Sequence, residues 1–504
     1  MPPVRTNHHP SRVAVIDIGS NSGRVVVLEQ DRAGHLRLVT GTRAPLRLVR
    51  DVDEQQSLSE ESMARTMEAL RDFHAIAAGA GARRIVAVAT AAMRDARNGP
   101  LFMDRIRREL GIRVEIIDGQ EEGRYGFAGA VRGLPVASGL LFDLGGGSMQ
   151  VSHFSNRRLD RVTSLPLGAL RLSETFLTSD PPRAKQIRRL EKHVLKHLAK
   201  ARVPKLGRSE QLLGTGGTLR NLAKIDRNAR HYPITRLHGY VLSRKRLHDI
   251  VADITPMRQK NRDEISGLSA ERADSIVGGA VAIETFMEHV GANQILVSGQ
   301  GVREGIALRL LKMAVAATKD VKEASLASLV SRFDGWNADA AARRRSVAAA
   351  LWKVLEPQSD PKIAEALDHS ARVLDIGRSL DFVARHELVA NILLSTELTG
   401  FTHEELALVS ALVRRAGDRH ADTKVFGPLI TDTDRAQLHR AAVVLALADE
   451  IEARCPHRRP IAVTCRIGRH VSISVPLLLS WRDKDLSQRF ERAFGKPLVV
   501  VTGA

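Results

Sequence analysis

A short motif occurs twice in this chain and constrains its fold more than any other feature. An apolar segment leads into Asp17-Ile18-Gly19, and another leads into Asp143-Leu144-Gly145, 126 residues later. In both copies a second apolar segment follows the glycine-rich turn, which predicts a pair of strands joined as a hairpin. A motif repeated at this distance indicates a duplicated structural unit.

Strands and helices are expected to alternate around both hairpins. We predict strands at 13–16, 25–28, 84–89, 114–117, 140–142, 150–154, 211–213 and 295–297. Helices are predicted at 59–80, 101–110 and 121–131. This alternation predicts two α/β subdomains.

The length of 504 residues is too great for one hydrophobic core, so several domains are expected. Beyond Lys319 helical periodicity dominates, and the last fifty residues contain two candidate strands, at 460–467 and 471–475. The predicted domains are 1–131, 132–318, 319–455 and 456–504.

The composition favours a cytoplasmic protein. The N-terminal residues are polar, and the longest apolar runs are too short to span a bilayer, so neither secretion nor membrane insertion is expected. Cys455 and Cys465 have no metal-binding spacing, which supports neither a disulfide framework nor a zinc site.

The positive charge is concentrated in the N-terminal two-thirds of the chain. Of the net charge of +19, residues 1–320 carry +16, which favours binding of anions such as polyphosphate. A predicted helix at 187–198 contributes a cationic face that is either solvated or an anion track. Aromatic residues make up only 4% of the chain, so stacking on nucleic acid bases is poorly supported, and no specific nucleic acid partner is expected.

Four glycine-rich loops follow predicted strands, at 17–24, 143–148, 214–218 and 299–305. Such loops expose backbone N–H groups that can hold a phosphate. One loop alone would be an ordinary turn, but four of them in an α/β chain favour a phosphate site. Complete P-loop and dinucleotide-binding motifs are missing from the sequence.

Carboxylates stand at two kinds of position in this pattern. Asp17 and Asp143 follow strands, where they either cap turns or supply oxygen ligands to Mg²⁺. Glu121 and Glu122 lie at a helix start, where the helix dipole favours acids whatever the function. One of this pair is a candidate general base that activates water for attack on a phosphoryl group.

These motifs resemble the family that unites exopolyphosphatases with guanosine pentaphosphate phosphohydrolases, within the actin-like ATPase superfamily. The matching segments are 17–24, 89–98, 119–124, 143–148, 214–218, 272–274 and 301–305. The resemblance implies duplicated actin-like (ribonuclease H-like) α/β subdomains, an all-α HD-like domain and a small α+β C-terminal domain. It also implies Mg²⁺ as cofactor and Glu122 as the general base.

The resemblance further implies a set of ligand-binding residues. Expected metal ligands are Asp17, Asp143 and Gln150. Expected substrate-binding residues are Ser20, Asn21, Ser22, Arg24, Arg94, Asn98, Gly145, Gly146, Gly147, Ser148, Gly214, Thr215, Gly216, Gly217 and Thr218. Gln150 stands where the family usually has Glu, which keeps an oxygen ligand but removes its charge.

The expected activity is that of an exopolyphosphatase, which releases orthophosphate from the end of inorganic polyphosphate. The alternatives are a guanosine pentaphosphate 5′-phosphohydrolase, a non-catalytic sensor of polyphosphate or nucleotide, and, more weakly, a sugar-kinase-like phosphotransferase. The helical domain lacks the His-Asp dipeptide of HD enzymes, so we expect it to bind polymer or to form a homodimer contact.

Overall fold

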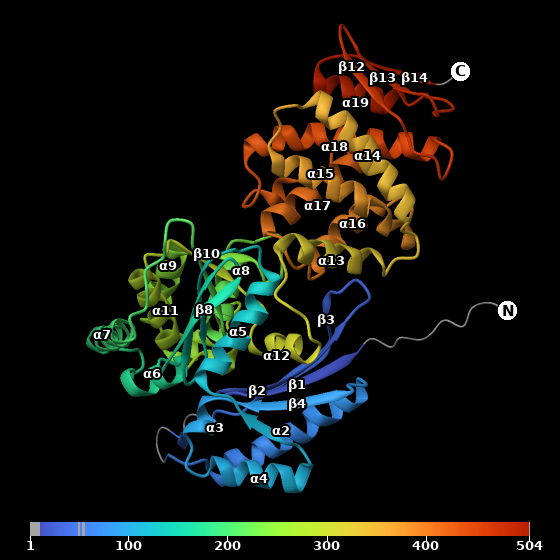
Figure 1. Cartoon of the computed structure of the whole chain (residues 1–504). Coiled ribbons are helices and arrows are strands. Elements are labelled where there is room, and N and C mark those ends of the chain that lie inside the picture. Colours follow the sequence, from blue (N-terminus) through green and yellow to red (C-terminus); the bar gives the residue numbers. More distant parts are fainter. Residues whose placement is uncertain (1–10, 49–50, 53–55, 503–504) are drawn as a thin grey trace, which may run out of the picture. The chain divides into compact units, whose positions relative to one another are not determined.

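The computed structural model describes residues 11–48, 51–52 and 56–502, which form two compact units (Figure 1). Of the described residues, those up to 231 and from 236 to 325 make up the first unit, and those from 232 to 235 and from 326 to 502 make up the second. Both glycine-rich hairpins belong to the first unit, so this unit contains the candidate site.

The first sheet of this unit has five strands in the order β3-β2-β1-β4-β5. The strands are β1 (Arg12–Ile18), β2 (Ser22–Gln30), β3 (Leu36–Pro45), β4 (Arg84–Ala89) and β5 (Val114–Ile116). The first three form an antiparallel meander, whereas β4 pairs parallel to β1 and β5 parallel to β4. The four strands predicted here are confirmed, while the half-exposed, basic β3 was not predicted.

The second sheet repeats this arrangement in the order β10-β11-β9-β6-β7-β8. Its strands are β6 (Gly139–Leu144), β7 (Met149–Ser155), β8 (Arg158–Leu165), β9 (Gln211–Thr215), β10 (Tyr240–Ser243) and β11 (Gln294–Val297). Again three strands form an antiparallel meander and the next two are parallel to its first strand. The predicted duplication is therefore confirmed, with β10 as an added antiparallel edge strand.

Residues 13–16 of strand β1 are all apolar because both faces of the first sheet are covered. Ala14 and Ile16 pack against helices α2 (Glu60–Gly79) and α4 (Gly99–Leu110). Val13 and Val15, which point to the other face, pack against α12 (Val302–Leu310). This double burial explains the continuous apolar run that precedes Asp17.

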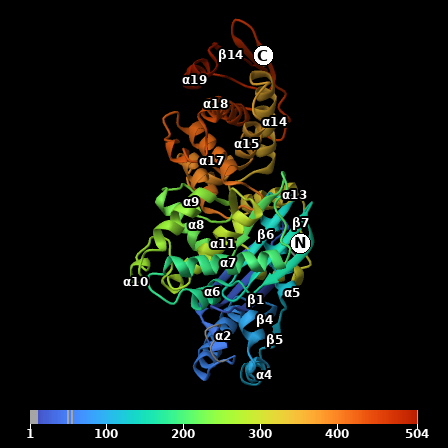
Figure 2. The ribbon, with the colours of Figure 1, turned by 90° about the vertical axis from the view of Figure 1, so that its left-hand side faces the viewer.

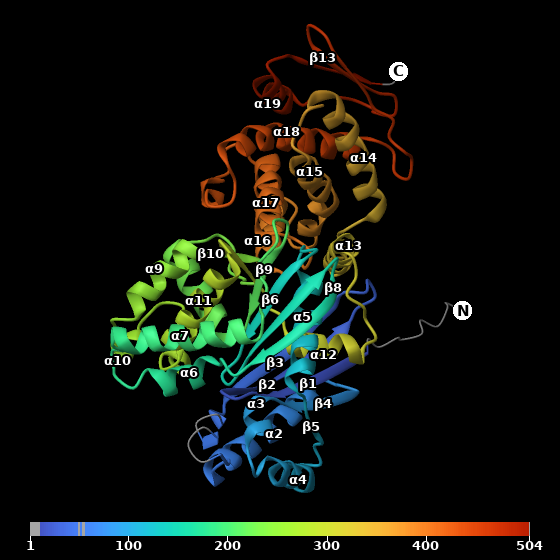
Figure 3. The same cartoon turned by 60° about the vertical axis from the view of Figure 1, so that its left-hand side comes forward.

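Helices α5 (Gly119–Gly133) and α12 lie side by side between the two sheets (Figure 3). Phe127 of α5 packs on the second sheet, and Ile306 of α12 packs on the first. α12 lies in the range predicted for the second subdomain (132–318), yet it packs on the first sheet. Packing therefore crosses the predicted boundary at 131/132.

The other face of the second sheet carries a layer of helices (Figure 2). They include α6 (Ala169–Phe176), α7 (Ala184–Lys200), α8 (Gly217–Ala229), α9 (Arg244–Ile254) and α11 (Ile276–Val290). The predicted basic helix is confirmed as α7, which buries Leu190, Val194 and Leu198 against the protein. Its cationic side chains lie on the exposed face.

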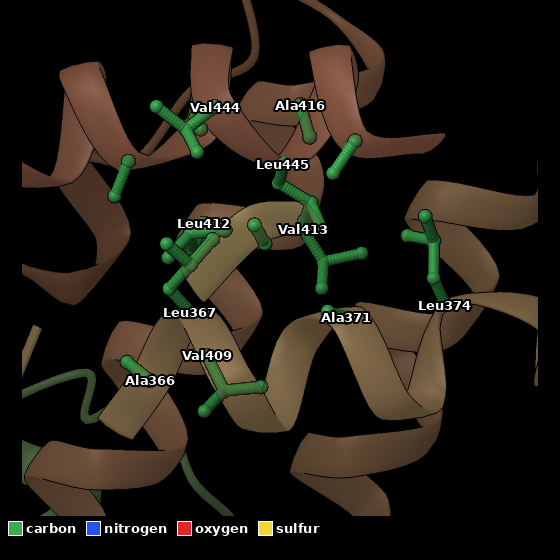
Figure 4. Close-up of a cluster of buried hydrophobic side chains, with 14 of the residues drawn as sticks. Ala366, Leu367, Ala371, Leu374, Val409, Leu412, Val413, Ala416, Val444 and Leu445 are labelled. Atoms are coloured by element: carbon green, nitrogen blue, oxygen red, sulfur yellow. The ribbon is translucent and has the colours of Figure 1, made fainter. Parts of the chain in front are cut away.

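The second unit is mainly helical, and its core lies between α15, α17 and α18 (Figure 4). Its helices are α14 (Ala338–Leu355), α15 (Pro361–Val373), α16 (Arg385–Ser395), α17 (His403–Gly417) and α18 (Asp432–Arg454); α13 (Thr318–Val330) leads into it. At the centre, the fully buried Arg344 forms ion pairs with Asp375 and Asp449 at 2.8 and 2.7 Å.

The C-terminal region adds a three-stranded sheet to this helical core. It contains β12 (Thr464–Ile467), β13 (Val471–Val475), α19 (Lys484–Phe494) and β14 (Leu498–Thr502), with the strand order β12-β13-β14. The two predicted strands are confirmed, and β14 was not predicted. Ile473 and Phe490 belong to the same apolar cluster as the helices, so the tail shares their core.

Candidate functional site

The two glycine-rich hairpins have equivalent geometry. Asp17 at the end of β1 pairs with Arg24 of β2, and Asp143 near the end of β6 pairs with Gln150 of β7. Each turn is closed by a backbone hydrogen bond, with Gly145 N donating to Ser148 O at 2.9 Å in the second one. The duplicated sequence motif thus becomes a duplicated local structure.

The tips of the two hairpins meet and line one cavity. A Cβ atom on Gly146 would lie 3.3 Å from Cβ of Asn21, and one on Gly147 would lie 3.0 Å from Oγ of Ser20. Any side chain at these two glycines would occupy the space between the hairpins. The glycines therefore allow the hairpins to approach each other closely.

The third and fourth loops complete the cavity wall. Thr215, Gly216 and Gly217 lie at the N-terminus of α8, and 301–303 lie at the N-terminus of α12. Gly216 has φ +105°, and a Cβ there would lie 2.3 Å from the carbonyl oxygen of Leu144. Both helices direct their N-terminal backbone groups at the cavity, which favours a bound anion.

Most of the predicted site residues line this cavity. They are Asp17, Ser20, Asn21, Ser22, Arg24, Glu122, Asp143, Gly145, Gly146, Gly147, Ser148, Thr215, Gly216 and Gly217. Predicted residues from three glycine-rich loops and from α5, up to 200 positions apart, are therefore brought together.

The structure does not place four of the predicted substrate-binding residues in the cavity wall. The side-chain amide of Asn98 donates through Nδ2 to the carbonyl of Leu58 and accepts through Oδ1 from its N–H. Asn98 therefore holds a loop in place. Gly214 is buried within β9, and Thr218 is buried in α8. Arg94 donates to the carbonyl of Ile117 at 2.8 Å and lies beside the cavity.

The capping of α5 distinguishes the two adjacent glutamates. Glu121 closes a capping box, because its carboxylate accepts from Asp118 N while Asp118 accepts from Glu121 N. Glu122, the next residue around the helix, points instead into the cavity. Glu121 therefore has a structural role, and Glu122 is the carboxylate available for chemistry.

Glu122 lies in an environment that opposes its ionisation. Its side chain is only 11% exposed, and burial followed by repulsion from Asp143 and Asp17 raises its pKa from 4.5 to about 8. Arg94, whose Nη1 is 4.0 Å from Oε2, acts in the opposite direction. A carboxyl group with its pKa in this range is suited to exchange a proton near neutral pH.

Gln150 lies behind the cavity wall. It is 2% exposed and does not line the cavity. Its amide nitrogen donates to Glu122 Oε2 at 3.1 Å, to Ser148 Oγ at 2.9 Å and to Ser164 Oγ at 3.3 Å. Gln150 thus lies behind Glu122 and holds that carboxylate, and its role as a metal ligand stays a prediction.

Asp17 and Asp143 fit the requirements of a divalent cation. Burial raises the pKa of both carboxyls, that of Asp143 to about 6, and their mutual repulsion adds to this for Asp143. Among the described residues neither carboxylate accepts a hydrogen bond. Mg²⁺ is commonly held by one or two carboxylates together with water and phosphate oxygens.

No larger ligand set is present in the part of the chain that the structure describes. It contains no group of three or more His, Cys, Asp or Glu side chains arranged around one metal position. In the helical unit, the carboxylate of Asp368 forms a bidentate ion pair with Arg345, at 2.7 and 2.8 Å.

Three arginines in the cavity wall were not among the predicted site residues. They are Arg220 on α8, Arg272 before α11 and Arg303 on α12. Arg272 and Arg303 lie in segments that carry the family resemblance, and Arg220 follows the third glycine loop by one turn. Their positions in or near these motifs could have marked the three arginines as site residues. The sequence alone, however, does not show that the three side chains meet.

The arginines form a cluster of like charges. Burial lowers the pKa of Arg24 to about 9, and repulsion from Arg220 and Arg303 adds to this. The pKa of Arg220 is lowered to about 10 by burial and by Arg303. Among the described residues the guanidinium groups of Arg24 and Arg303 donate no hydrogen bonds. A bound phosphate would supply both the missing acceptors and the missing negative charge.

Comparison with known proteins places this site in a family context. Residues 26–314 match the family model described as Ppx/GppA phosphatase family, and residues 321–464 match Ppx/GppA phosphatase, domain III. Exopolyphosphatase 1 of Mycobacterium tuberculosis is 31% identical over 339 residues, which cover 66% of this chain and 98% of that protein. Guanosine-5'-triphosphate,3'-diphosphate pyrophosphatase of Photobacterium profundum is 26% identical over 417 residues, 80% of each chain.

Solved structures are similar to about three-fifths of this chain. A Ppx/GppA family member from Aquifex aeolicus is 30% identical with a TM-score of 0.53, covering 60% of this chain and 98% of its own. An exopolyphosphatase from Cytophaga hutchinsonii is 25% identical with a TM-score of 0.56, covering 61% of this chain and 100% of its own.

Proposed function

Because the chain belongs to the Ppx/GppA phosphatase family, we propose that it is a cytoplasmic exopolyphosphatase that hydrolyses the terminal phosphoanhydride bond of inorganic polyphosphate. The observation that carries this proposal is the position of Glu122. This carboxyl group, with its raised pKa, lines a cavity that also contains two aspartates and a cluster of arginines.

Glu122 is the proposed general base. A water molecule between its carboxylate and the terminal phosphorus would form the new P–O bond as the anhydride bond breaks and a water proton passes to Glu122. The products are orthophosphate and a chain shorter by one phosphate. Gln150 keeps the carboxylate in place through its 3.1 Å hydrogen bond, which favours the ionised form.

The arginines are the proposed phosphate ligands. Arg24, Arg220 and Arg303 present guanidinium groups that match the geometry of phosphoryl oxygens, and phosphoryl transfer depends mainly on such positioning and charge stabilisation. Mg²⁺, held by Asp17 and Asp143, would supply further positive charge to the phosphoryl and leaving oxygens. Arg94 adds positive charge beside Glu122, which favours the basic form of that residue.

A guanosine pentaphosphate 5′-phosphohydrolase is the second candidate. It is supported by the Photobacterium profundum relative, which is aligned with 80% of this chain. The same residues would perform the same chemistry on the 5′-terminal phosphate. The +16 charge of residues 1–320 favours the more highly charged polymer.

One assay separates these activities. We expect the purified chain with Mg²⁺ to release orthophosphate faster from long-chain polyphosphate than from guanosine pentaphosphate, and Glu122→Gln to abolish release from both. Faster release from the nucleotide would select the second candidate. Tight binding of polyphosphate without release, across several divalent metals, would instead identify a sensor.

Two further proposals concern the state of the protein in the cell: that it is cytoplasmic and that it forms a homodimer. None of the helices in the described residues is long and apolar enough to cross a membrane. The proposed homodimer is tested by the mass of the full chain in light scattering after gel filtration. A monomeric mass at micromolar concentration would refute it.

A further inference from the structure

A second group of cations continues the arginine cluster beyond the cavity. Arg43 of β3 lies directly opposite Arg24 of β2 in the antiparallel register. Lys224 lies four residues after Arg220 on α8, so these two side chains share one face of the helix. Each of the two cavity arginines therefore has a cationic neighbour farther along its own sheet or helix.

The two outer cations come from different elements but lie near each other. Partial burial lowers the pKa of Lys224, and repulsion from Arg43 is the next largest cause. Burial, and after it repulsion from Arg43, lowers the pKa of Arg272, whose guanidinium lies against Gly217 at the N-terminus of α8. Arg43, Lys224 and Arg272 thus surround one region next to the cavity.

Acidic side chains compensate these cations only in part. Glu271 lies 3.5 Å from Arg43, but both side chains are more than one-third exposed, so this pair is weak. Lys224 has no acidic partner among the described residues. Like charges directly opposite each other on adjacent strands, as in Arg24 and Arg43, are destabilising. The arrangement therefore favours an anion that bridges the outer cations.

The residues that line the cavity indicate what kind of anion could extend from it to the outer cations. Its lining, as far as the chain is described, contains no aromatic side chain, and Leu144 and Val302 are its only large apolar residues. This wall offers no platform on which a nucleobase would stack. A row of cations that runs from the cavity arginines to Arg43 and Lys224 suits a ligand with repeated negative charges.

We propose that Arg43 and Lys224 form an outer anion site that binds phosphate groups of the polyphosphate chain behind the terminal phosphate held in the cavity. This inference rests on the proposed function and extends it to substrate length. A chain that reaches the outer site gains contacts that a triphosphate lacks. The site thus makes the enzyme selective for long chains.

The test uses the full-length double variant Arg43→Gln/Lys224→Gln. We expect the KM for long-chain polyphosphate to rise about tenfold, while the KM for tripolyphosphate rises less than about twofold, because partly exposed phosphate contacts contribute modestly and independently of chemistry. In the Glu122→Gln background, the Kd for long-chain polyphosphate should weaken by the same factor, and its salt dependence should become shallower.

The matched control is Arg188→Gln/Lys196→Gln, which removes the same charge from the exposed face of α7. It should leave both KM values unchanged. An equal loss in this control would attribute the effect to net charge and overturn the outer site. Circular dichroism of both variants at equal concentration checks that they remain folded.

The substrates separate this inference from the proposed function. If the wild type hydrolyses polyphosphate but Arg43→Gln/Lys224→Gln affects long and short chains equally, the outer site is refuted and the proposed function stands. If the wild type hydrolyses guanosine pentaphosphate and not polyphosphate, the proposed function fails, and the chain-length site fails with it.

Discussion

Replacing Glu122 by Gln is expected to abolish activity and, in alkaline solution, to stabilise the metal-free protein. Raising the pKa of a carboxyl from 4.5 to about 8 corresponds to about 5 kcal/mol, at 1.36 kcal/mol per tenfold change in proton affinity. This is the upper limit of what ionised Glu122 costs the folded first unit. Gln keeps the shape of the side chain and an oxygen that accepts from Gln150.

The sign of the effect follows from the raised pKa. Below pH 4.5 Glu122 is protonated in both the folded and the unfolded chain, so the variant and the wild type should be equally stable. As the pH rises towards 8, the unfolded chain loses its proton while the folded chain retains it, and the wild type becomes less stable. Above pH 8 the variant should be more stable by up to about 5 kcal/mol.

The assay is urea unfolding in EDTA at pH 4.5, 7 and 9. The three tryptophans, Trp336, Trp352 and Trp481, all lie in the second unit, so their fluorescence reports the unfolding of that unit rather than of the unit that contains Glu122. Far-UV circular dichroism follows both units. Added Mg²⁺ should reduce the difference, because a cation near Asp17 and Asp143 offsets the repulsion that raises the pKa of Glu122.

Two results would refute this reasoning. Equal stability of variant and wild type at pH 9 would show that Glu122 ionises without cost and that its environment is misassigned. Phosphate release by the variant within about tenfold of the wild type would show that Glu122 is not the base, since removing a general base costs about 10²-fold or more.

Four other substitutions have distinct expected outcomes. Asp143→Asn should raise the Mg²⁺ concentration for half-maximal phosphate release at least about tenfold, and an unchanged titration would exclude this ligand. Gln150→Glu should move the acidic limb of the pH profile of kcat/KM upward by about one pH unit or more, because a carboxylate would replace the amide 3.1 Å from Glu122. Arg303→Lys should raise KM about tenfold through loss of the forked donor geometry, as checked by initial rates over a range of substrate concentrations. Arg344→Met should destabilise the second unit by about 3 kcal/mol in tryptophan-monitored unfolding, because Asp375 and Asp449 would lose their fully buried partner and keep only Arg378 and Arg385. A midpoint equal to that of the wild type would contradict this.

Local sequence pattern was sufficient to predict the elements that carry the site. The apolar runs before Asp17 and Asp143 predicted β1 and β6, and the glycine-rich turns after them predicted the two hairpins. Strands that are half exposed, such as β3 and β8, escaped prediction because their side chains alternate less clearly between apolar and polar.

The residue that departs from its family shows where a local motif is insufficient. The resemblance to the family implied a metal role for Gln150, which stands opposite Asp143 in the strand register. The amide faces Glu122, because α5 packs across β7 and β8 and brings Glu122 to that side of the strand. The direction of a side chain depends on packing partners that the motif does not contain.

The sequence by itself determined that the chain repeats an α/β unit, that glycine-rich loops follow its strands, and that two aspartates end equivalent strands. These properties depend on neighbours within a few positions, so they can be read locally. Only the tertiary structure decided that Arg24, Arg220, Arg272 and Arg303 form one cluster, and that Glu122 rather than Glu121 faces it. Those facts arise from contacts between segments up to 280 residues apart, which the pairing of strands and the packing of α5 and α12 between the two sheets bring together.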